Sequence, residues 1–322
     1  MLSWWMNTTE TEARLELREV AMPEPGPRQL LVRVRAAGVN RGEFIIGGLV
    51  KAGNAKALGI EAAGEVVKAG AETSRFAPGA RVMGRFAGSL SEYVLANEAE
   101  AMPVPEGLSW EEAGSLPTTS MVAQDMLVLQ GGLQRGGWLL VTGVTSGVGV
   151  ASLQIARALG AQVIGTSGSR TKLDKLRSLG LDVALCTRQP DFQAQVMDAT
   201  GGAGVNLVVN NVGGTVFAEC VRCLAFEGRL ATVGYVDGVL KADIDLQALH
   251  AKRLVLFGVS NKMTSAEQKA RATAQFESEM LPLVQAGKLR PLIDRVFPFD
   301  QLPAARAHIE ASAHVGKIVV TA

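Results

Sequence analysis

The chain has 322 residues, and its 32 lysines and arginines nearly balance 31 acidic residues, which argues against nucleic acid or a membrane surface as a partner. No apolar run reaches the roughly 18 residues of a transmembrane span, and residues 1–15 lack the cationic start and apolar core of a secretory signal. Three cysteines cannot form a disulfide framework, so we expect a reducing, cytoplasmic environment. The length is typical of two domains.

The part of the chain before about Ser120 is predicted to be rich in β-structure. Residues 30–36 alternate apolar and polar side chains at a period of two, as a half-exposed strand does. Short apolar segments punctuated by glycine or proline follow at residues 59–70, 77–84 and 89–96. This pattern of short apolar segments predicts an all-β region or a partly open barrel.

From about Ser120 to Val259, apolar strands alternate with helical segments. The predicted strands are Trp138–Thr142, Ala161–Gly165, Asp182–Leu185, Asn206–Val209, Arg229–Val233 and Arg253–Val259. The predicted helices are Val148–Leu159, Lys172–Ser178, Phe192–Ala199 and Thr215–Ala225. Continuous apolar strands separated by helices indicate a parallel sheet covered on both faces. Six such strands make a doubly wound α/β domain.

The first of these strands runs into a glycine-rich turn, residues 143–149, and then into an amphipathic helix. Turn amides and a helix N-terminus favour an anion such as a pyrophosphate. The spacing departs from the strict G-x-G-x-x-G, because Ser152 stands where the third glycine is expected, but a small residue there still permits close packing. The turn residues predicted to bind a nucleotide are Thr145, Ser146, Gly147, Val148 and Gly149.

The end of the second strand favours NADP(H) over NAD(H). An NAD site usually has Asp or Glu there to accept from the ribose 2′-OH, whereas the first carboxylate in this chain is Asp174. The side chains of Ser167, Ser169, Arg170 and Lys172 are predicted to hold a 2′-phosphate by charge-assisted hydrogen bonds. The alternative is that the second serine is an ordinary helix cap and that the two cations are solvated.

Further candidates follow the later strands, because ligands of such sheets bind at the carboxyl ends of the strands. The cofactor-binding candidates are Asn210, Asn211 and Val212 after the fourth strand, Gly234 and Tyr235 after the fifth, and Ser260 after the sixth. A turn role for Ser260 and an ordinary loop position for Tyr235 are the alternatives.

The tail after Val259 changes in character again. A helix over residues 265–286 leads through an irregular segment to a second helix and a last strand, Lys317–Val320. We expect this tail to complete the first domain. The predicted division is therefore 1–119 and 260–322 for a catalytic domain, with an NADP-binding domain at 120–259 inserted between them.

Five sequence blocks, in order along the chain, resemble the medium-chain dehydrogenase/reductase superfamily, and within it the zinc-independent NADPH:quinone oxidoreductases of the zeta-crystallin-like branch. The blocks are residues 59–66, 76–82, 103–109, 205–214 and 315–319. The resemblance implies a GroES-like, partly open β-barrel as the catalytic domain, and a Rossmann domain with a six-stranded parallel sheet.

Two positions imply that no metal is bound. The zinc alcohol dehydrogenases of this superfamily have a cysteine in the segment matching residues 37–41 and a histidine before the glutamate of the matching G-x-E block. This chain has Asn40 and Ile60 at those places. Neither an amide nor an isobutyl group replaces a thiolate or an imidazole in a tetrahedral zinc site.

The activity that the resemblance implies is hydride transfer from NADPH to a quinone or an α,β-unsaturated carbonyl. Such a small-molecule electrophile spreads the incoming charge into a phenolate or enolate, so that hydrogen bonds and solvent protonation suffice. The alternatives are an enoyl reductase acting on a CoA or carrier thioester, and an NADPH-binding protein without turnover. A short-chain reductase is excluded, because neither Tyr93 nor Tyr235 has a lysine four residues later.

The catalytic candidates are Asn40 and Tyr235. The resemblance places Asn40 over the nicotinamide and the substrate, where its amide could donate to a developing oxyanion. The alternative is a loop asparagine that caps a turn. Tyr235 is predicted to stack on or bond the cofactor or substrate. Lys317, in the closing block, is predicted to reach the cofactor, the alternative being a charge at a strand edge.

Relatives in this superfamily pair their nucleotide domains through the edge of the sixth strand. Residues 254–259 are apolar enough to form such an edge, which would otherwise invite aggregation. We therefore expect a homodimer.

Overall fold

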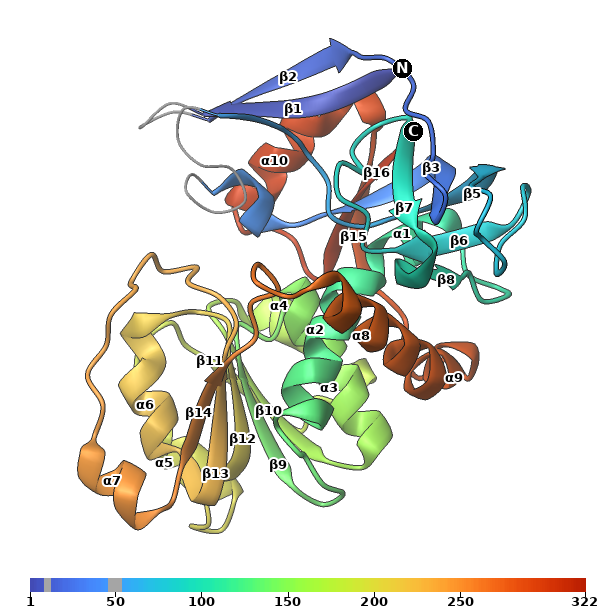
Figure 1. The fold of residues 1–322 in the computed structure, drawn as a ribbon. Helices are drawn as coiled ribbons and strands as arrows, with labels where there is room; N and C mark the ends of the chain where they lie inside the picture. The colour runs from blue at the N-terminus through green and yellow to red at the C-terminus, as the bar shows by residue number, and fades with distance from the viewer. Residues whose placement is uncertain (9–12, 46–53) are drawn as a thin grey trace. The chain divides into compact units, whose positions relative to one another are not determined.

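The computed structural model describes residues 1–8, 13–45 and 54–322, and it divides the chain into two compact units (Figure 1). Unit 1 contains Met1–Met121, Ser265–Gln285 and Arg290–Ala322, and unit 2 contains Val122–Thr264 with Ala286–Leu289. The blue and the red ends of the chain in Figure 1 thus belong to the same unit. The functional division into a catalytic and an NADP-binding domain stays a prediction.

Unit 2 is built on a six-stranded parallel sheet with the strand order β11-β10-β9-β12-β13-β14. The strands are β9 (Trp138–Thr142), β10 (Gln162–Ser167), β11 (Val183–Cys186), β12 (Val205–Asn210), β13 (Leu224–Thr232) and β14 (Val255–Gly258). The two central strands, β9 and β12, are almost wholly buried because both faces of the sheet are covered. The predicted doubly wound α/β fold is confirmed, with shifts at the strand ends.

Helices connect these strands, and Figure 1 shows α3 and α6 on opposite sides of the sheet. The helices are α3 (Gly147–Leu159), α4 (Arg170–Leu176), α5 (Gln193–Ala199), α6 (Phe217–Arg222) and α7 (Leu246–Ala251). Gly160 ends α3 in the left-handed region, with φ of 81°. The helix predicted to run to Ala225 is shorter, because β13 already begins at Leu224.

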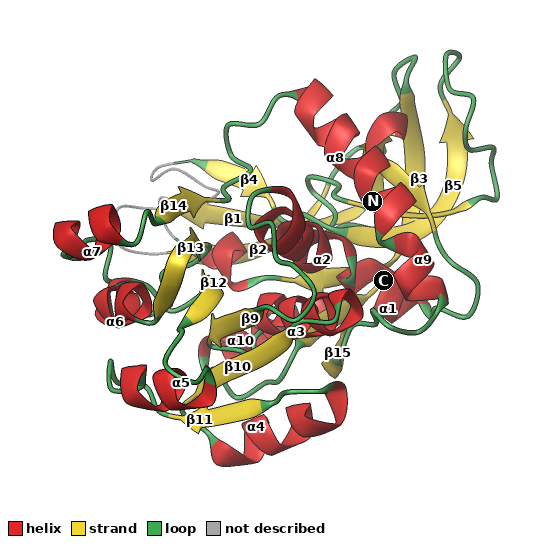
Figure 2. Ribbon diagram, turned by 90° about the horizontal axis from the view of Figure 1, so that it is seen from below, coloured by secondary structure: helices red, strands yellow, loops and turns green. Residues whose placement is uncertain are grey.

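Unit 1 is the β-rich region that the sequence predicts. Its larger sheet has the order β15-β16-β3-β5-β6-β8, with β7 paired to β3, and a smaller sheet has the order β2-β1-β4. The strands are β1 (Leu2–Thr8), β2 (Ala13–Glu19), β3 (Gln29–Val39), β4 (Ala55–Ala57), β5 (Ala62–Ala69), β6 (Arg81–Gly84), β7 (Tyr93–Asn97), β8 (Ala101–Pro103), β15 (Ile293–Pro298) and β16 (Lys317–Thr321). Figure 2 shows β3 and β5, which pair antiparallel, side by side. The two C-terminal strands join this sheet, whereas residues 260–264 and 286–289 of the tail belong to unit 2.

The helices of unit 1 are α1 (Trp110–Ser115), α8 (Ala266–Glu279), α9 (Leu281–Gln285) and α10 (Leu302–Glu310), and α2 (Pro117–Gln124) begins in this unit. The single helix predicted over 265–286 is two helices. Pro282 lacks the N–H that a continuous helix needs, and α8 ends just before it, at Glu279.

Candidate functional site

The glycine-rich turn of unit 2 has the shape of a phosphate cradle. Gly143 adopts a left-handed φ of 64°. A Cβ on Gly149 would lie 2.5 Å from the carbonyl oxygen of Val144, so only glycine fits there. The hydroxyl of Ser146 caps α3 by accepting from the Gly149 amide at 3.1 Å. The turn therefore presents the N-terminus of a 13-residue helix, which suits the pyrophosphate of a dinucleotide.

The corner after β10 carries the residues predicted to hold the 2′-phosphate. Ser169 stands at the N-cap position of α4 but makes no side-chain cap hydrogen bond, so the alternative of an ordinary capping serine is not supported. The Arg170 guanidinium reaches the carbonyl of Ala184 at only 3.4 Å. The first carboxylate, on Asp174, is ion-paired with Arg177 at 3.1 Å. Hydroxyls and cations thus line this corner, which fits NADP.

The loop after β12 is held by Asn210, whose side chain is fully buried. Its Oδ1 accepts from the Thr142 hydroxyl at 3.0 Å and from the amides of Val212 and Gly213 at 3.1 Å each. Its Nδ2 donates to the Gly213 carbonyl at 3.0 Å. Asn211 donates in turn to the Thr142 carbonyl at 2.9 Å. This bonding shows that the Asn210 side chain shapes the loop after β12, and its predicted contact with the cofactor stays a prediction.

The other predicted residues at the ends of the strands lie on the surface of unit 2. Tyr235 is 55% exposed, which leaves its ring accessible to a ligand. Gly234 lies close to the loop after β12, since a Cβ there would come 3.0 Å from the carbonyl oxygen of Asn211. The Ser260 hydroxyl accepts from the Lys262 amide at 3.4 Å, in line with its turn alternative. Cofactor contacts of these three residues stay predictions.

In unit 1, strand register brings together two polar residues that lie far apart in the sequence. β16 pairs antiparallel with β3, and Ile318 lies opposite Val39. Lys317 precedes Ile318 and Asn40 follows Val39, so these two residues meet where the strand pair ends. The Lys317 ammonium donates to Asn40 Oδ1 at 2.7 Å. Because only 4% of Lys317 is exposed, the alternative of a charge at a strand edge is wrong.

The third neighbouring strand adds a buried carboxylate, from Glu61 just before β5. Its Oε1 accepts from Lys317 Nζ at 2.6 Å and from Asn40 Nδ2 at 2.9 Å, and its Oε2 accepts from the Thr118 amide at 2.8 Å. Gly38 makes room for it, since a Cβ there would lie 2.4 Å from Oε1. A buried ion pair whose two partners also make further hydrogen bonds is the arrangement that can offset desolvation.

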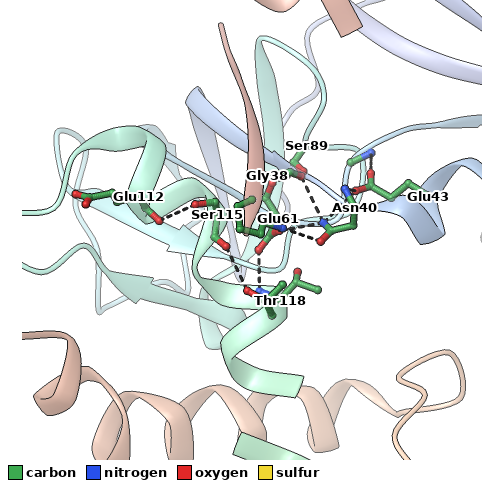
Figure 3. Close-up of polar contacts among 11 residues, drawn as sticks. Gly38, Asn40, Glu43, Glu61, Ser89, Glu112, Ser115 and Thr118 are labelled. Atoms are coloured by element: carbon green, nitrogen blue, oxygen red, sulfur yellow. Dashed lines mark hydrogen bonds and ion pairs between the residues drawn. The ribbon is translucent and has the colours of Figure 1, made fainter. Parts of the chain in front are cut away.

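A second buried carboxylate, Glu43, completes what we call the Lys317 cluster, which consists of Asn40, Glu43, Glu61 and Lys317. Figure 3 shows Asn40 between Glu43 and Glu61. Glu43 Oε1 accepts from the Asn40 amide at 2.9 Å and from Asn40 Nδ2 at 3.1 Å, and Oε2 accepts from the Gly59 amide at 3.0 Å. Burial raises the pKa of Glu43 to about 7, against the lowering effect of the bonds from Asn40.

The raised pKa of Glu43 should make stability depend on pH. The folded chain holds this proton more tightly than the unfolded chain, so the free energy of unfolding should fall as the pH rises from 4.5 to about 7, and level off above that. A shift of this size corresponds to about 3 kcal/mol. The Glu43→Gln variant should lose most of this fall, as measured by denaturant unfolding across the same pH range. An unchanged slope in the variant would assign the pH dependence to other groups.

Two family models match the chain. One is described as "Alcohol dehydrogenase GroES-like domain" and covers residues 26–106, and the other as "Zinc-binding dehydrogenase" and covers residues 147–277. The chain belongs to the medium-chain dehydrogenase/reductase superfamily. The predicted GroES-like and Rossmann parts are thereby confirmed, and the solved neighbours are consistent with the zinc-independent branch.

Similar proteins in this superfamily include parts of much longer chains. The chain is 32% identical over 297 residues to the Spectinabilin polyketide synthase system protein NorB of Streptomyces orinoci, with 92% of this chain but only 13% of that protein covered. Among solved structures, the mycobacterial protein Rv1454c, complexed with NADPH, has 25% identity and a TM-score of 0.89, with 100% of both chains covered. CurK enoyl reductase has 25% identity and a TM-score of 0.87, covering 99% of this chain and 98% of that one.

The geometry of the Lys317 cluster revises the role predicted for Asn40. Both hydrogens of its Nδ2 point to carboxylates, and its Oδ1 accepts from Lys317, so donation to an oxyanion would require breaking one of these bonds. Sequence reasoning missed Glu43 and Glu61 as site residues. A signal was present, because Glu61 lies in the G-x-E block beside Ile60, the place that holds a zinc-ligating histidine in the zinc alcohol dehydrogenases.

Neither a metal cluster nor a membrane span is found in the part of the chain that the structure describes. No group of three or more histidine, cysteine or acidic residues in residues 1–8, 13–45 and 54–322 could hold a metal ion. Within those same ranges, no helix combines the length and the apolar composition that crossing a bilayer requires. The donor types themselves, an amide and an isobutyl group at the two positions discussed, fit zinc poorly.

Proposed function

We propose that this chain transfers hydride from NADPH to an electrophilic carbon of a quinone or an α,β-unsaturated carbonyl, without zinc. The observation that carries the proposal is that Asn40, at the position where zinc enzymes of the superfamily have a cysteine ligand, is bonded instead to the Lys317 ammonium and to the buried Glu61 carboxylate. Reducing a simple ketone creates an alkoxide, which calls for a metal or a strong proton donor. An acceptor that delocalises its charge needs only hydrogen bonds and a nearby positive charge.

NADPH fits the residues of unit 2, and when bound it supplies the hydride. The turn at residues 143–149 would hold its pyrophosphate, and Ser167, Ser169, Arg170 and Lys172 would hold its 2′-phosphate. The first acidic side chain after β10, Asp174, is neutralised by Arg177 and does not oppose that phosphate. The NADPH complex of the similar mycobacterial protein supports this cofactor.

The Lys317 cluster would serve the acceptor in two ways. Three neighbouring segments of the sheet anchor it and hold the Asn40 side chain in place, which would limit the poses that a substrate can adopt. Its buried Lys317–Glu61 ion pair is a fixed dipole in a region of low dielectric, where its field is stronger than in water. The proton that completes the reduction would then come from solvent.

An enoyl reductase acting on a thioester is the second candidate. The similarity to NorB, which covers almost the whole of this chain, and to CurK enoyl reductase favours it. The hydride chemistry is the same, and the difference lies in what carries the double bond.

One panel of assays separates these functions. The purified chain is given NADPH with 1,4-benzoquinone, with a small enone or with an enoyl-CoA, and NADPH oxidation is followed. We expect the quinone or the enone to have the highest kcat/KM. A clear preference for the enoyl-CoA would support the second candidate instead. NADPH binding without turnover of any acceptor would leave a non-catalytic binding protein.

We also propose that the chain forms a homodimer through β14. This strand is at the edge of the six-stranded sheet, and its Val255 is 41% exposed. An unprotected apolar edge is a site for pairing with another copy. Light scattering should give twice the mass of the chain, and a lysine in place of Val255 should shift it toward the monomer. A monomeric wild-type chain would contradict the proposal.

A further inference from the structure

An arginine that sequence reasoning did not single out lies beside the corner predicted to hold the 2′-phosphate. β10 and β11 are parallel neighbours with Ser167 opposite Cys186, so the segments that leave the two strands run side by side. Arg188, from the segment after β11, lies directly against Gly168. A Cβ on Gly168 would come within 2.0 Å of Arg188 Nε and 2.6 Å of its Cγ.

The guanidinium of Arg188 is exposed and uncompensated. None of the hydrogen bonds, ion pairs and ring contacts found between described residues involves it. By contrast, Arg177 of the same unit is paired with a carboxylate, and Arg170 donates to a carbonyl. The nearest acid along the chain, Asp191, accepts from the Thr187 hydroxyl at 2.7 Å. The hydroxyls of Ser167 and Ser169 are on the other segment. An open guanidinium fork beside hydroxyl donors is suited to a phosphate.

Gly168 is needed for space and not for backbone conformation. Its φ lies outside the left-handed region, so an alanine could adopt the same backbone. What a methyl group would displace is the flexible end of the Arg188 side chain. The glycine therefore keeps the guanidinium against the turn between Ser167 and Ser169.

We propose that Arg188 binds the 2′-phosphate of NADPH and sets the preference for NADPH over NADH. Gly168 leaves the space that the Arg188 side chain needs to reach this position. The inference rests on the NADPH binding of the proposed function. It adds a ligand from β11 to the ligands expected from β10 and α4, so that the phosphate would be held from two sides.

Two variants test the same contact in different ways. Arg188→Gln removes the charge, whereas Gly168→Ala keeps the charge and moves it. Affinities of the purified full chain for NADPH and for NADH are measured separately by calorimetric titration. We expect Arg188→Gln to weaken NADPH binding about tenfold or more and to leave NADH binding unchanged. Gly168→Ala should weaken NADPH binding in the same selective way, and the double variant should be no weaker than Arg188→Gln alone.

The matched control is Arg253→Gln, an exposed arginine of the same unit that is paired with Glu227, and it should change neither affinity. Equal losses for both nucleotides in Arg188→Gln, or no loss at all, would overturn the inference. A selective loss in Arg188→Gln with none in Gly168→Ala would overturn the role of Gly168. A wild-type chain that binds NADH as tightly as NADPH would instead defeat the cofactor of the proposed function, and the inference with it.

Discussion

The Lys317→Met variant should lose about 3–5 kcal/mol of unfolding free energy, because it leaves the fully buried carboxylate of Glu61 without its cation. Glu43 lies close by, so two acidic groups would then share a buried region that contains no positive charge. If the proposed function holds, kcat/KM for the preferred acceptor should also fall by about a hundredfold. Denaturant unfolding and steady-state kinetics measure the two effects.

A matched control and a rescue make this prediction sharp. Lys68→Met removes a lysine from an exposed pair with Glu24, and it should cost less than about 1 kcal/mol. The double variant Lys317→Met/Glu61→Gln should be more stable than Lys317→Met alone, because no unpaired charge remains. If the double variant is no more stable, the loss comes from packing and not from the uncompensated carboxylate.

The Gly149→Val variant should bind NADPH more weakly than the wild-type chain, by about a hundredfold or more. Even the first carbon of the new side chain would lie 2.5 Å from the Val144 carbonyl oxygen, which is backbone and cannot move aside cheaply. The turn and the first residues of α3 must then separate, and the amides that face the phosphates lose their common direction. Titration with NADPH measures the loss.

The control for this steric prediction is Gly42→Ala in unit 1. A Cβ there meets no atom within 4 Å, and φ of Gly42 is outside the left-handed region, so NADPH affinity should be unchanged. Retention of wild-type affinity by Gly149→Val would show that the turn is not the pyrophosphate site.

Much of unit 2 could be predicted from local sequence. Apolar runs such as Trp138–Thr142 are buried on both faces of a parallel sheet, and the observed β9 has the predicted bounds. The glycine turn was also predicted, as was the start of α3 to within one residue, because the steric limits that shape such a turn act within a few residues. Where prediction erred, as for the helix that becomes β13 at Leu224, sheet pairing overrode local helical preference.

By itself, then, the sequence determined the superfamily, the parallel sheet and the nucleotide turn, since these depend on patterns read within short segments. Only the tertiary structure decided which residues Lys317 contacts, because its hydrogen-bond partners Asn40 and Glu61 are 277 and 256 residues away in the chain. It likewise placed Arg188 against Gly168, across two neighbouring strands. The physical reason is that strand register sets which distant side chains meet, and register is settled by the burial of whole sheet faces rather than by any one segment.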